Sequence, residues 1–584
     1  MNILVIHNDN LPDISVKDEN IRIKELKLEP PVIDFDNYDE FVSDVLGAEF
    51  KQNKNNYDLI VLPYSLSSKN YMEFSGITVA LHIRLTKDWN HTKKPILFVG
   101  PDKPEEVMKF SPLGDFLNTS YVFKTPKKGE SDFLRMFEYI RDDISSEMSD
   151  SQYEQFINRI HIEAPANYGR HALANEWSMM RWTQRYKNLE GKFVSGVQSL
   201  LFLKYLLVKN QIIEKIKNKD KSQAIIANIK DLIHSPVGLH KCPKIMFIDD
   251  EYKKGWGSIF SQIFKDSGVD ENNFLIFKDF VKGEAKGILI NKINAFIDNN
   301  DADLFIVDLR LHDADFNCTY DEISGHEIIK HLANGQHKGK QIIIFTASEK
   351  ANNLKLIVEN NPNITDYVIK DSPDKKVKKT SSNSFDSFSQ AVQKAFKRIY
   401  IRQYLTQLIA IFGSYEGIPF KLRNFIDLLI LDKSENKNNV VGSMLIILNA
   451  YLEDYITSQR GFCIDGNQKL IYKNWRGRDC EISFPHDFMY FSKDKRSVQF
   501  LDSQPYAKNG EMTFADNSQA YTKIIRALRN YYDFDLETLN LVCNLKQERN
   551  IEAHQENNSD INFEDIKKLF EVILKILELD KNKS

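Results

Sequence analysis

Polar residues capable of phosphoryl chemistry follow four apolar segments in the middle of the chain. They are Asp249 and Asp250 after KIMFI, Asp308 after DLFIV, Thr346 after QIIIF and Lys370 after DYVI. Clustered carboxylates can hold Mg²⁺ and leave positions for water and a phosphate. A carboxylate whose charge is offset by a metal can attack phosphorus and become an acyl phosphate, while a threonine hydroxyl and a lysine can bind the phosphoryl oxygens. These residue types therefore indicate a magnesium-dependent site that accepts a phosphoryl group.

Five apolar runs between 243 and about 372 would position these side chains. KIMFIDD, NFLIF, DLFIVDL, QIIIFTA and DYVIK repeat a five-strand pattern that also fills residues 1–145, where the runs alternate with amphipathic helical segments. Such alternation predicts a parallel, doubly wound sheet. Because the C-terminal ends of parallel strands meet at one crevice, we expect the polar residues to converge there.

This constellation resembles that of the response-regulator receiver family, with an acidic pair, a phosphoacceptor aspartate, a threonine followed by alanine (FTAS) and a lysine in that order. The resemblance implies a flavodoxin-like sheet, phosphorylation catalysed by the domain itself, and a sensor histidine kinase or other phosphodonor as partner. It implies Asp308 as phosphoacceptor, Mg²⁺ held by Asp250, Asp308 and the backbone carbonyl of Arg310 with Asp249 assisting through water, and Thr346 and Lys370 as residues that report phosphorylation. The long loop between Asp308 and Gly325 departs from the family pattern. The alternative is an unphosphorylated α/β module whose acids only cap strands.

Residues 1–145 form a second copy of the pattern that lacks this chemistry. We predict strands at 3–7, 31–35, 57–64, 95–100 and 120–124. Aligned strand by strand with the middle copy, this copy has His7 and Asn8 at the acidic pair, Pro63 at the phosphoacceptor and Val99 at the threonine, whereas Lys124 survives. Without carboxylates it has neither a magnesium cage nor a nucleophile. We interpret it as a degenerate pseudo-receiver used for dimer or partner contacts.

Length and periodicity predict the remaining organisation. A chain of 584 residues is too long for one core. The predicted domains are a pseudo-receiver (1–145), a helical connector (146–240), a receiver (241–389) and a C-terminal region (390–584) that begins with a long helix at 390–412. A polar run at 374–387 is predicted to be a linker, and a segment at about 461–515 is predicted to insert short strands into the C-terminal helices.

Composition excludes several classes of protein. The formal net charge of −4 gives no global basic field for nucleic acid. Five scattered cysteines without a CxxC motif argue against a structural zinc site or a disulfide framework. No stretch approaches 18 uninterrupted apolar residues, so we expect a cytoplasmic protein without a membrane partner.

The C-terminal region carries a second candidate site in RNIEAH, where Arg549 and His554 are five positions apart. On an ideal helix they would point about 140° from one another, so they would converge only if the helix frays or bends, or if a second chain contributes. The motif and its place before a final long helix resemble the HEPN family of helical domains. The resemblance implies a metal-independent endoribonuclease with no cofactor, formed by a homodimer. In it His554 would be the general acid/base or would orient the 2′-hydroxyl, Arg549 would stabilise charge on the scissile phosphate of an RNA substrate, and Asn550 would help position the substrate or His554. The alternative is a surface arginine and a histidine at a helix end.

Two further groups of residues could take part in an RNA site. KLIYKNWRGRDCEISF combines cations and aromatic rings that could stack bases, although an ordinary amphipathic hairpin is favoured; its residues are Lys469, Tyr472, Lys473, Trp475, Arg476 and Arg478. Glu453 and Asp454 were the other group. Together the features predict a phosphorylation-regulated HEPN ribonuclease, an architecture that resembles bacterial stress or anti-phage defence effectors. The competing hypothesis is a non-catalytic adaptor that binds RNA or a partner protein.

Overall fold

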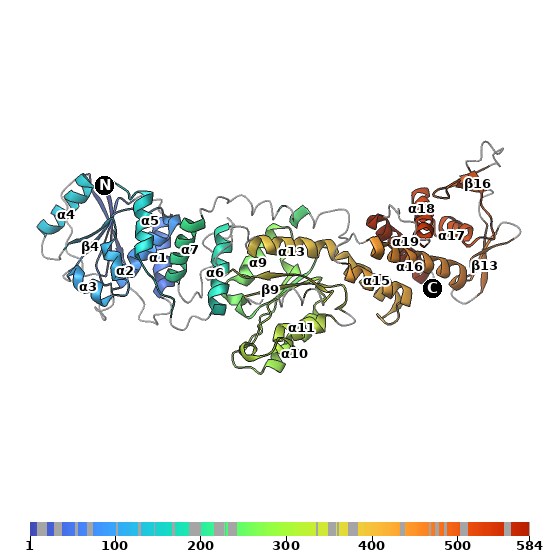
Figure 1. The fold of residues 1–584 in the computed structure, drawn as a ribbon, viewed down its shortest axis with the longest axis horizontal. Coiled ribbons are helices and arrows are strands. Elements are labelled where there is room, and N and C mark those ends of the chain that lie inside the picture. Colours follow the sequence, from blue (N-terminus) through green and yellow to red (C-terminus); the bar gives the residue numbers. More distant parts are fainter. Residues whose placement is uncertain are drawn as a thin grey trace.

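The computed structural model arranges two α/β domains and a helical C-terminal region in a row along its long axis (Figure 1). The described residues are 1–8, 20–28, 38–52, 57–66, 74–100, 103–125, 130–144, 146–165, 170–185, 200–214, 227, 229–231, 242–333, 337–347, 358, 361–371, 384–432, 438–465, 469–473, 478–483, 488–502, 512–553 and 562–582.

The first domain is a five-stranded parallel sheet in the order β2-β1-β3-β4-β5. Its strands are β1 (Asn2–His7), β2 (Arg22–Lys27), β3 (Leu59–Leu62), β4 (Ile96–Val99) and β5 (Val122–Thr125), and its helices are α1 (Tyr38–Gln52), α2 (Ser75–Leu85), α3 (Pro104–Phe110) and α4 (Glu130–Asp143). Every residue of β3 and β4 is buried, as expected for strands covered on both faces. The predicted parallel sheet is confirmed.

The prediction missed strand β2. The strand beside β1 is Arg22–Lys27, whereas the apolar run predicted at 31–35 lies outside the described residues. β2 lies at the edge of the sheet, and most of its side chains are exposed or half-buried. An edge strand with the sequence RIKELK has no apolar run to reveal it.

The second domain has the same topology, with strand order β10-β9-β8-β6-β7. Its strands are β6 (Ile245–Ile248), β7 (Phe274–Ile276), β8 (Leu304–Val307), β9 (Gln341–Thr346) and β10 (Ile364–Ile369), and its helices are α9 (Trp256–Asp266), α10 (Lys286–Asn299), α11 (Ser324–Leu332) and α13 (Ser384–Arg398). In both sheets the first strand lies between the second and the third, which is the flavodoxin-like order. All five predicted strands are present.

The described helices of 146–240 cover both α/β domains. They are α5 (Asp150–Arg159), α6 (Arg170–Arg185) and α7 (Leu200–Glu214). α7 packs on α1, α2 and α5 of the first domain. α6 instead joins the second domain, where Trp182 Nε1 donates to Ser384 Oγ at 2.8 Å. This stretch is helical, as its periodicity predicted.

The C-terminal region is mainly helical. Its helices are α14 (Tyr400–Phe412), α15 (Phe420–Leu431), α16 (Asn438–Asp454), α17 (Ala520–Asn530), α18 (Leu536–Ala553) and α19 (Phe563–Asn582). Two three-stranded antiparallel sheets form the predicted insertion. The first contains β11 (Cys463–Ile464), β12 (Lys469–Lys473) and β13 (Asp479–Ser483), and the second contains β14 (Phe488–Ser492), β15 (Val498–Leu501) and β16 (Met512–Phe514). Among the described helices, one segment, Val440–Gln459, is long and apolar enough to cross a membrane, and half of its most apolar part is buried inside the protein. Its buried side chains, including Leu448 and Tyr451, belong to the core of this region.

The long helix predicted at 390–412 is two helices. α13 ends at Arg398, Ile399 is the junction, and α14 begins at Tyr400. Ile399 belongs to the core of the α/β part, whereas Tyr400 belongs to the core of the C-terminal region. The periodicity runs through the junction, but the two apolar faces pack on different cores, and this ends one helix and begins the next.

Candidate phosphoacceptor and metal site

The ends of four strands bring the predicted residues together. Asp249 follows β6, Asp308 follows β8, Thr346 ends β9 and Lys370 follows β10. Adjacent strands are tied at this edge, because Asp308 N donates to Ile248 O at 3.0 Å and Lys370 N donates to Thr346 O at 2.8 Å. The sheet therefore places these side chains at one edge, as the topology requires.

Three carboxylates converge there. Asp249, Asp250 and Asp308 each offer an oxygen, and these oxygens lie within 4.8 Å of one another. Asp249 and Asp308 have no exposed surface, whereas Asp250 is exposed. The cluster is thus buried on the side of the sheet and open to solvent at Asp250.

Lys370 offsets part of the negative charge of the two buried carboxylates. Its Nζ lies 3.0 Å from Asp249 Oδ2 and 2.9 Å from Asp308 Oδ2. The same ammonium group lies 4.8 Å from the centroid of the Phe345 ring and 5.6 Å from that of Trp256. The sequence analysis found Lys370 but missed these rings, since neither belongs to the polar pattern it used.

Burial and charge shift the pKa values in this cluster. Burial raises the pKa of Asp249, and repulsion by Asp308 adds to the rise while Lys370 opposes it. The pKa of Asp250 is raised by loss of water around its carboxyl group and by the charges of Asp249 and Asp308. Asp250 as a whole is exposed to solvent, which weakens the effect of burial on its pKa; the repulsion by the neighbouring carboxylates does not depend on that burial. Burial would lower the pKa of Lys370, but the attraction of its two carboxylate partners outweighs it and raises that pKa, so the lysine is charged.

Backbone groups orient the two buried carboxylates. Glu251 N donates to Asp249 Oδ1 at 2.8 Å, and Arg310 N donates to Asp308 Oδ1 at 3.3 Å. The start of α11 closes on this strand end, because a Cβ at Gly325 would lie 2.4 Å from Asp308 O. Only glycine allows the two backbones to approach so closely.

The donor set fits Mg²⁺. Three carboxylate oxygens in one cluster are hard ligands of the kind that this ion binds, and the exposed side leaves room for water. Asp249, Asp250 and Asp308 would hold it, and the carbonyl of Arg310 stays a predicted ligand. When bound, the ion would supply positive charge that offsets the carboxylates and an incoming phosphate.

The long loop between Asp308 and Gly325 is held in place by one buried aspartate. Asp315 accepts hydrogen bonds from Leu311 N at 3.1 Å and from Ser324 N at 3.1 Å, and its carboxylate pairs with Lys286 at 3.0 Å. The described part of the loop contains 3₁₀ turns at Asp313–Asn317 and Tyr320–Glu322. The loop is therefore structured beside the site.

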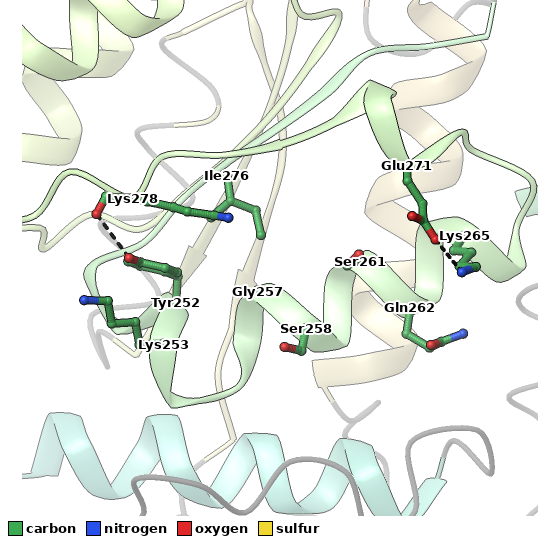
Figure 2. A pocket seen from close by; sticks show the side chains of 10 residues that line it. All are labelled: Tyr252, Lys253, Gly257, Ser258, Ser261, Gln262, Lys265, Glu271, Ile276 and Lys278. Carbon is green, nitrogen blue, oxygen red and sulfur yellow. Dashed lines mark hydrogen bonds and ion pairs between the residues drawn. The ribbon is translucent and has the colours of Figure 1, made fainter.

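A pocket lies between α9 and β7 (Figure 2), and its lining includes Tyr252, two residues after Asp250. Lys253, Lys265 and Lys278 line it, and Lys265 pairs with Glu271. None of the clustered carboxylates lines this pocket, so it is separate from the carboxylate cluster.

The first domain has no such cluster at the equivalent strand ends. His7 ends β1, Pro63 follows β3 and Val99 ends β4. Asn8 Nδ2 donates to the carbonyl of Leu66 at 2.8 Å. These positions offer no carboxylate, in agreement with the predicted loss of chemistry.

The C-terminal candidates are only partly described. Arg549 and Asn550 lie near the end of α18, whereas His554 lies outside the described residues. The Nε atom of Arg549 is buried without a hydrogen-bond partner among the described residues. The structure therefore does not test whether Arg549 and His554 lie together.

The other residues weighed for RNA contacts have ordinary structural partners. Glu453 pairs with Lys546 of α18 at 2.6 Å, and Asp454 lies 3.8 Å from Lys421. β12 and β13 form an antiparallel hairpin, the favoured alternative, in which Lys469 pairs with Glu481 at 2.8 Å. Trp475 and Arg476 lie outside the described residues.

Comparison with known proteins identifies one part of the chain. A family model described as the inactive receiver domain matches residues 8–125. This match agrees with the degenerate receiver predicted for the first domain. No curated protein and no solved structure matches the chain.

Proposed function

We propose that this chain is a phosphorylation-controlled regulator whose second α/β domain accepts a phosphoryl group on Asp308. The observation that supports this is the convergence of Asp249, Asp250 and Asp308 with Lys370 at one sheet edge. An α/β module whose acidic residues only cap strands would not need three clustered carboxylates in contact with a buried lysine. The inactive receiver match in the first domain supports a regulatory role for the pair of domains.

In this reaction a carboxylate oxygen of Asp308 attacks the phosphorus of the donor. The bond between phosphorus and the donor's leaving atom breaks, and its electron pair departs with the donor. Lys370 holds Asp308 in place and then balances the charge of the bound phosphoryl group. The hydroxyl of Thr346 donates to a phosphoryl oxygen. A phosphodonor is thus the partner that this function requires.

The signal would leave the site through helix α6. The rings beside Lys370 contact Trp182 of α6, with centroid distances of 5.1 Å to Trp256 and 5.6 Å to Phe345. Ser178 of the same helix donates to the carbonyl of Asp371 at 3.0 Å, directly after Lys370. Any displacement of Lys370 by a phosphoryl group therefore acts on packing that α6 shares.

The experiment is phosphoryl uptake from a small-molecule phosphodonor with Mg²⁺, measured by intact mass. Wild type should gain one phosphoryl group, and Asp308→Asn should gain none. Asp313→Asn changes an exposed aspartate of the neighbouring loop and should behave as wild type. Equal uptake by Asp308→Asn and wild type would show that Asp308 is not the phosphoacceptor.

We further propose that the C-terminal region is the output and cleaves RNA with Arg549, Asn550 and His554 in a homodimer. The ribose 2′-hydroxyl would attack the adjacent phosphorus, the bond to the 5′ oxygen would break, and a 2′,3′-cyclic phosphate and a 5′-hydroxyl would form. The buried Nε of Arg549, which lacks a partner among the described residues, supports a role for this side chain in binding a ligand.

RNA cleavage is tested on total RNA in EDTA, which removes metal-dependent nucleases. Wild type should cut, and His554→Ala and Arg549→Ala should not, whereas His161→Ala, which changes an exposed histidine just after α5, should cut normally. A parallel arm with Mg²⁺ and phosphodonor measures control by Asp308. If wild type binds RNA without cutting it, the region is a non-catalytic adaptor.

A further inference from the structure

A second cluster of metal-ligating side chains lies in the second α/β domain, away from the phosphoacceptor site. Asp298 is in the last turn of α10, His331 is in the last turn of α11, and His337 begins the short segment before β9. α10 and α11 pack against one another, so their C-terminal ends lie together. The phosphoacceptor carboxylates follow the C-terminal ends of the strands, whereas this cluster precedes the start of β9.

The geometry of the cluster is that of neighbouring ligands on one ion. Asp298 Oδ1 lies 2.9 Å from His331 Nε2 and 2.8 Å from His337 Nε2. Ligand atoms about 2.0–2.1 Å from a Zn²⁺ ion lie roughly 3 Å from one another, so three such atoms can share an ion with small shifts. The two imidazole rings are 4.9 Å apart between centroids, and both turn Nε2 to the same carboxylate oxygen.

The environment suits a cation with one open side. The His337 side chain is 5% exposed, whereas those of His331 and Asp298 are 26% and 40% exposed, so the cluster is partly open to solvent. The ammonium group of Lys340 lies nearby but pairs with Asp301 at 3.1 Å.

We propose that Asp298, His331 and His337 form a binding site for a divalent first-row transition ion of the Zn²⁺ class. Two imidazoles and one carboxylate are borderline ligands that favour such ions over Mg²⁺. Three protein ligands leave a fourth position for water, as in open zinc sites.

The site adjoins the contact between this domain and the C-terminal region. Lys338, next to His337, pairs with Asp427 of α15 at 2.9 Å and donates to Tyr415 at 2.8 Å. Arg402 of α14 pairs with Asp301, three residues after Asp298, at 3.0 Å. A metal ion at the cluster would fix the segments that carry both contacts, and so would strengthen the attachment of the C-terminal helices.

The test measures Zn²⁺ bound by the chelator-treated full chain during dialysis with excess Mg²⁺, which competes at the phosphoacceptor carboxylates. One zinc equivalent should be present in wild type and in His161→Ala, and absent in the His331→Ala/His337→Ala double variant. Asp298→Asn keeps the side-chain volume and should bind at least about tenfold more weakly. Co²⁺ replacing Zn²⁺ should give a visible ligand-field spectrum that the double variant lacks.

The folded state of each variant is checked by circular dichroism in chelator. Zinc should raise the melting temperature of wild type but not that of the double variant. An unchanged zinc equivalent in the double variant would overturn the proposal. So would the absence of bound zinc in wild type, which would leave only a hydrogen-bonded cluster.

Discussion

At the scale of single residues, Lys370 decides whether two buried carboxylates are tolerated. Asp249 and Asp308 are fully buried, and each lies within 3.0 Å of this lysine. Buried charges are stable only when they are paired, and removal of one partner leaves the other uncompensated. The lysine is therefore a structural element of the resting site as well as a candidate phosphate sensor.

Replacement of Lys370 by methionine should lower the free energy of unfolding by about 3–5 kcal/mol without divalent ions. Mg²⁺ should restore more stability to this variant than to wild type, because the carboxylates then have a different counter-charge. Chemical denaturation with and without Mg²⁺ measures both effects. Lys253→Met, at an exposed lysine three residues after Asp250, should change little. Equal Mg²⁺ stabilisation of Lys370→Met and wild type would contradict the prediction.

His82 makes the stability of the first domain depend on pH. It is fully buried, with Nε2 3.0 Å from Asp39 and Nδ1 3.2 Å from the ammonium group of Lys204. Burial and the charge of Lys204 lower the pKa of His82 below its ordinary value of 6.5, although Asp39 opposes this. The unfolded chain therefore binds the proton more readily than the folded one.

The stabilising effect of a neutral His82 should be present above pH 6.5 and lost as the pH falls below it. The expected slope is at most about 1.4 kcal/mol per pH unit. Urea unfolding of wild type and of His82→Gln between neutral and mildly acidic pH tests this. The variant should show a flatter dependence. Parallel curves for the two proteins would show that other groups cause the loss.

The residues of the candidate phosphoacceptor site could be predicted because they lie at or just after the ends of strands that stand out in the sequence as apolar runs. The strand order then forces Asp249, Asp308 and Thr346 to one edge. The rings that contact Lys370 were not predictable, because Trp256 and Phe345 belong to the apolar pattern and only the fold shows which apolar residues meet a charge. The Asp298, His331 and His337 cluster was also missed: His331 and His337 have a short spacing that could have drawn attention to them, but Asp298 is distant in sequence and only the fold brings it to them.

At the scale of elements, Gly325 sets the distance between α11 and the end of β8. A Cβ there would lie 2.4 Å from Asp308 O and 2.5 Å from Leu309 Cα. Both are backbone atoms, so rotation of a side chain cannot relieve the contact. The helix and the phosphoacceptor can keep their present relation only with glycine.

Gly325→Ala should destabilise the second domain and slow phosphoryl uptake at Asp308, because the helix must move away from the strand end. Overpacking of this kind costs about 1–3 kcal/mol. Gly287→Ala in α10 is the matched control, since its Cβ would meet nothing within 4 Å. That change should stabilise the helix by about 0.5–1 kcal/mol. Thermal unfolding and phosphorylation rates measure the two variants, and similar behaviour of both would refute the steric argument.

The elements predicted from periodicity are those with one continuous buried face. β3, β4, β6, β8 and β9 are short and almost wholly buried, so their apolar runs were visible. β2 was missed because half-buried edge strands resemble polar loops. The break at Ile399 was missed because periodicity shows that a face is apolar and does not show which core it contacts.

At the scale of the whole molecule, Arg398 joins the α/β part to the C-terminal region. This buried residue, the last of α13, donates to the carbonyls of Asp432, Leu429 and Ile430 at the end of α15. A guanidinium group there satisfies several carbonyls that a helix end leaves unpaired and complements its dipole.

Arg398→Met should remove these three bonds and lower the stability of the C-terminal region by roughly 4–5 kcal/mol, the low end of the sum, because hydrogen bonds to a charged group contribute about 1.5–3 kcal/mol each. Scanning calorimetry should show an earlier, separate transition of that region. Lys397→Met, which alters the exposed neighbouring cation, should leave the melting profile unchanged. A profile of Arg398→Met that matches wild type would show that the contact does not couple the two parts.

The junction at Ile399 leaves no flexible segment between the α/β part and the C-terminal region. One residue separates a helix that packs on the phosphoacceptor sheet from a helix inside the C-terminal core. Because only Ile399 separates the two helices, we expect a tilt of α13 to change the orientation of α14. If phosphorylation of Asp308 controls the C-terminal region as proposed, a length change of even a few residues at this junction should alter the response without touching either candidate site.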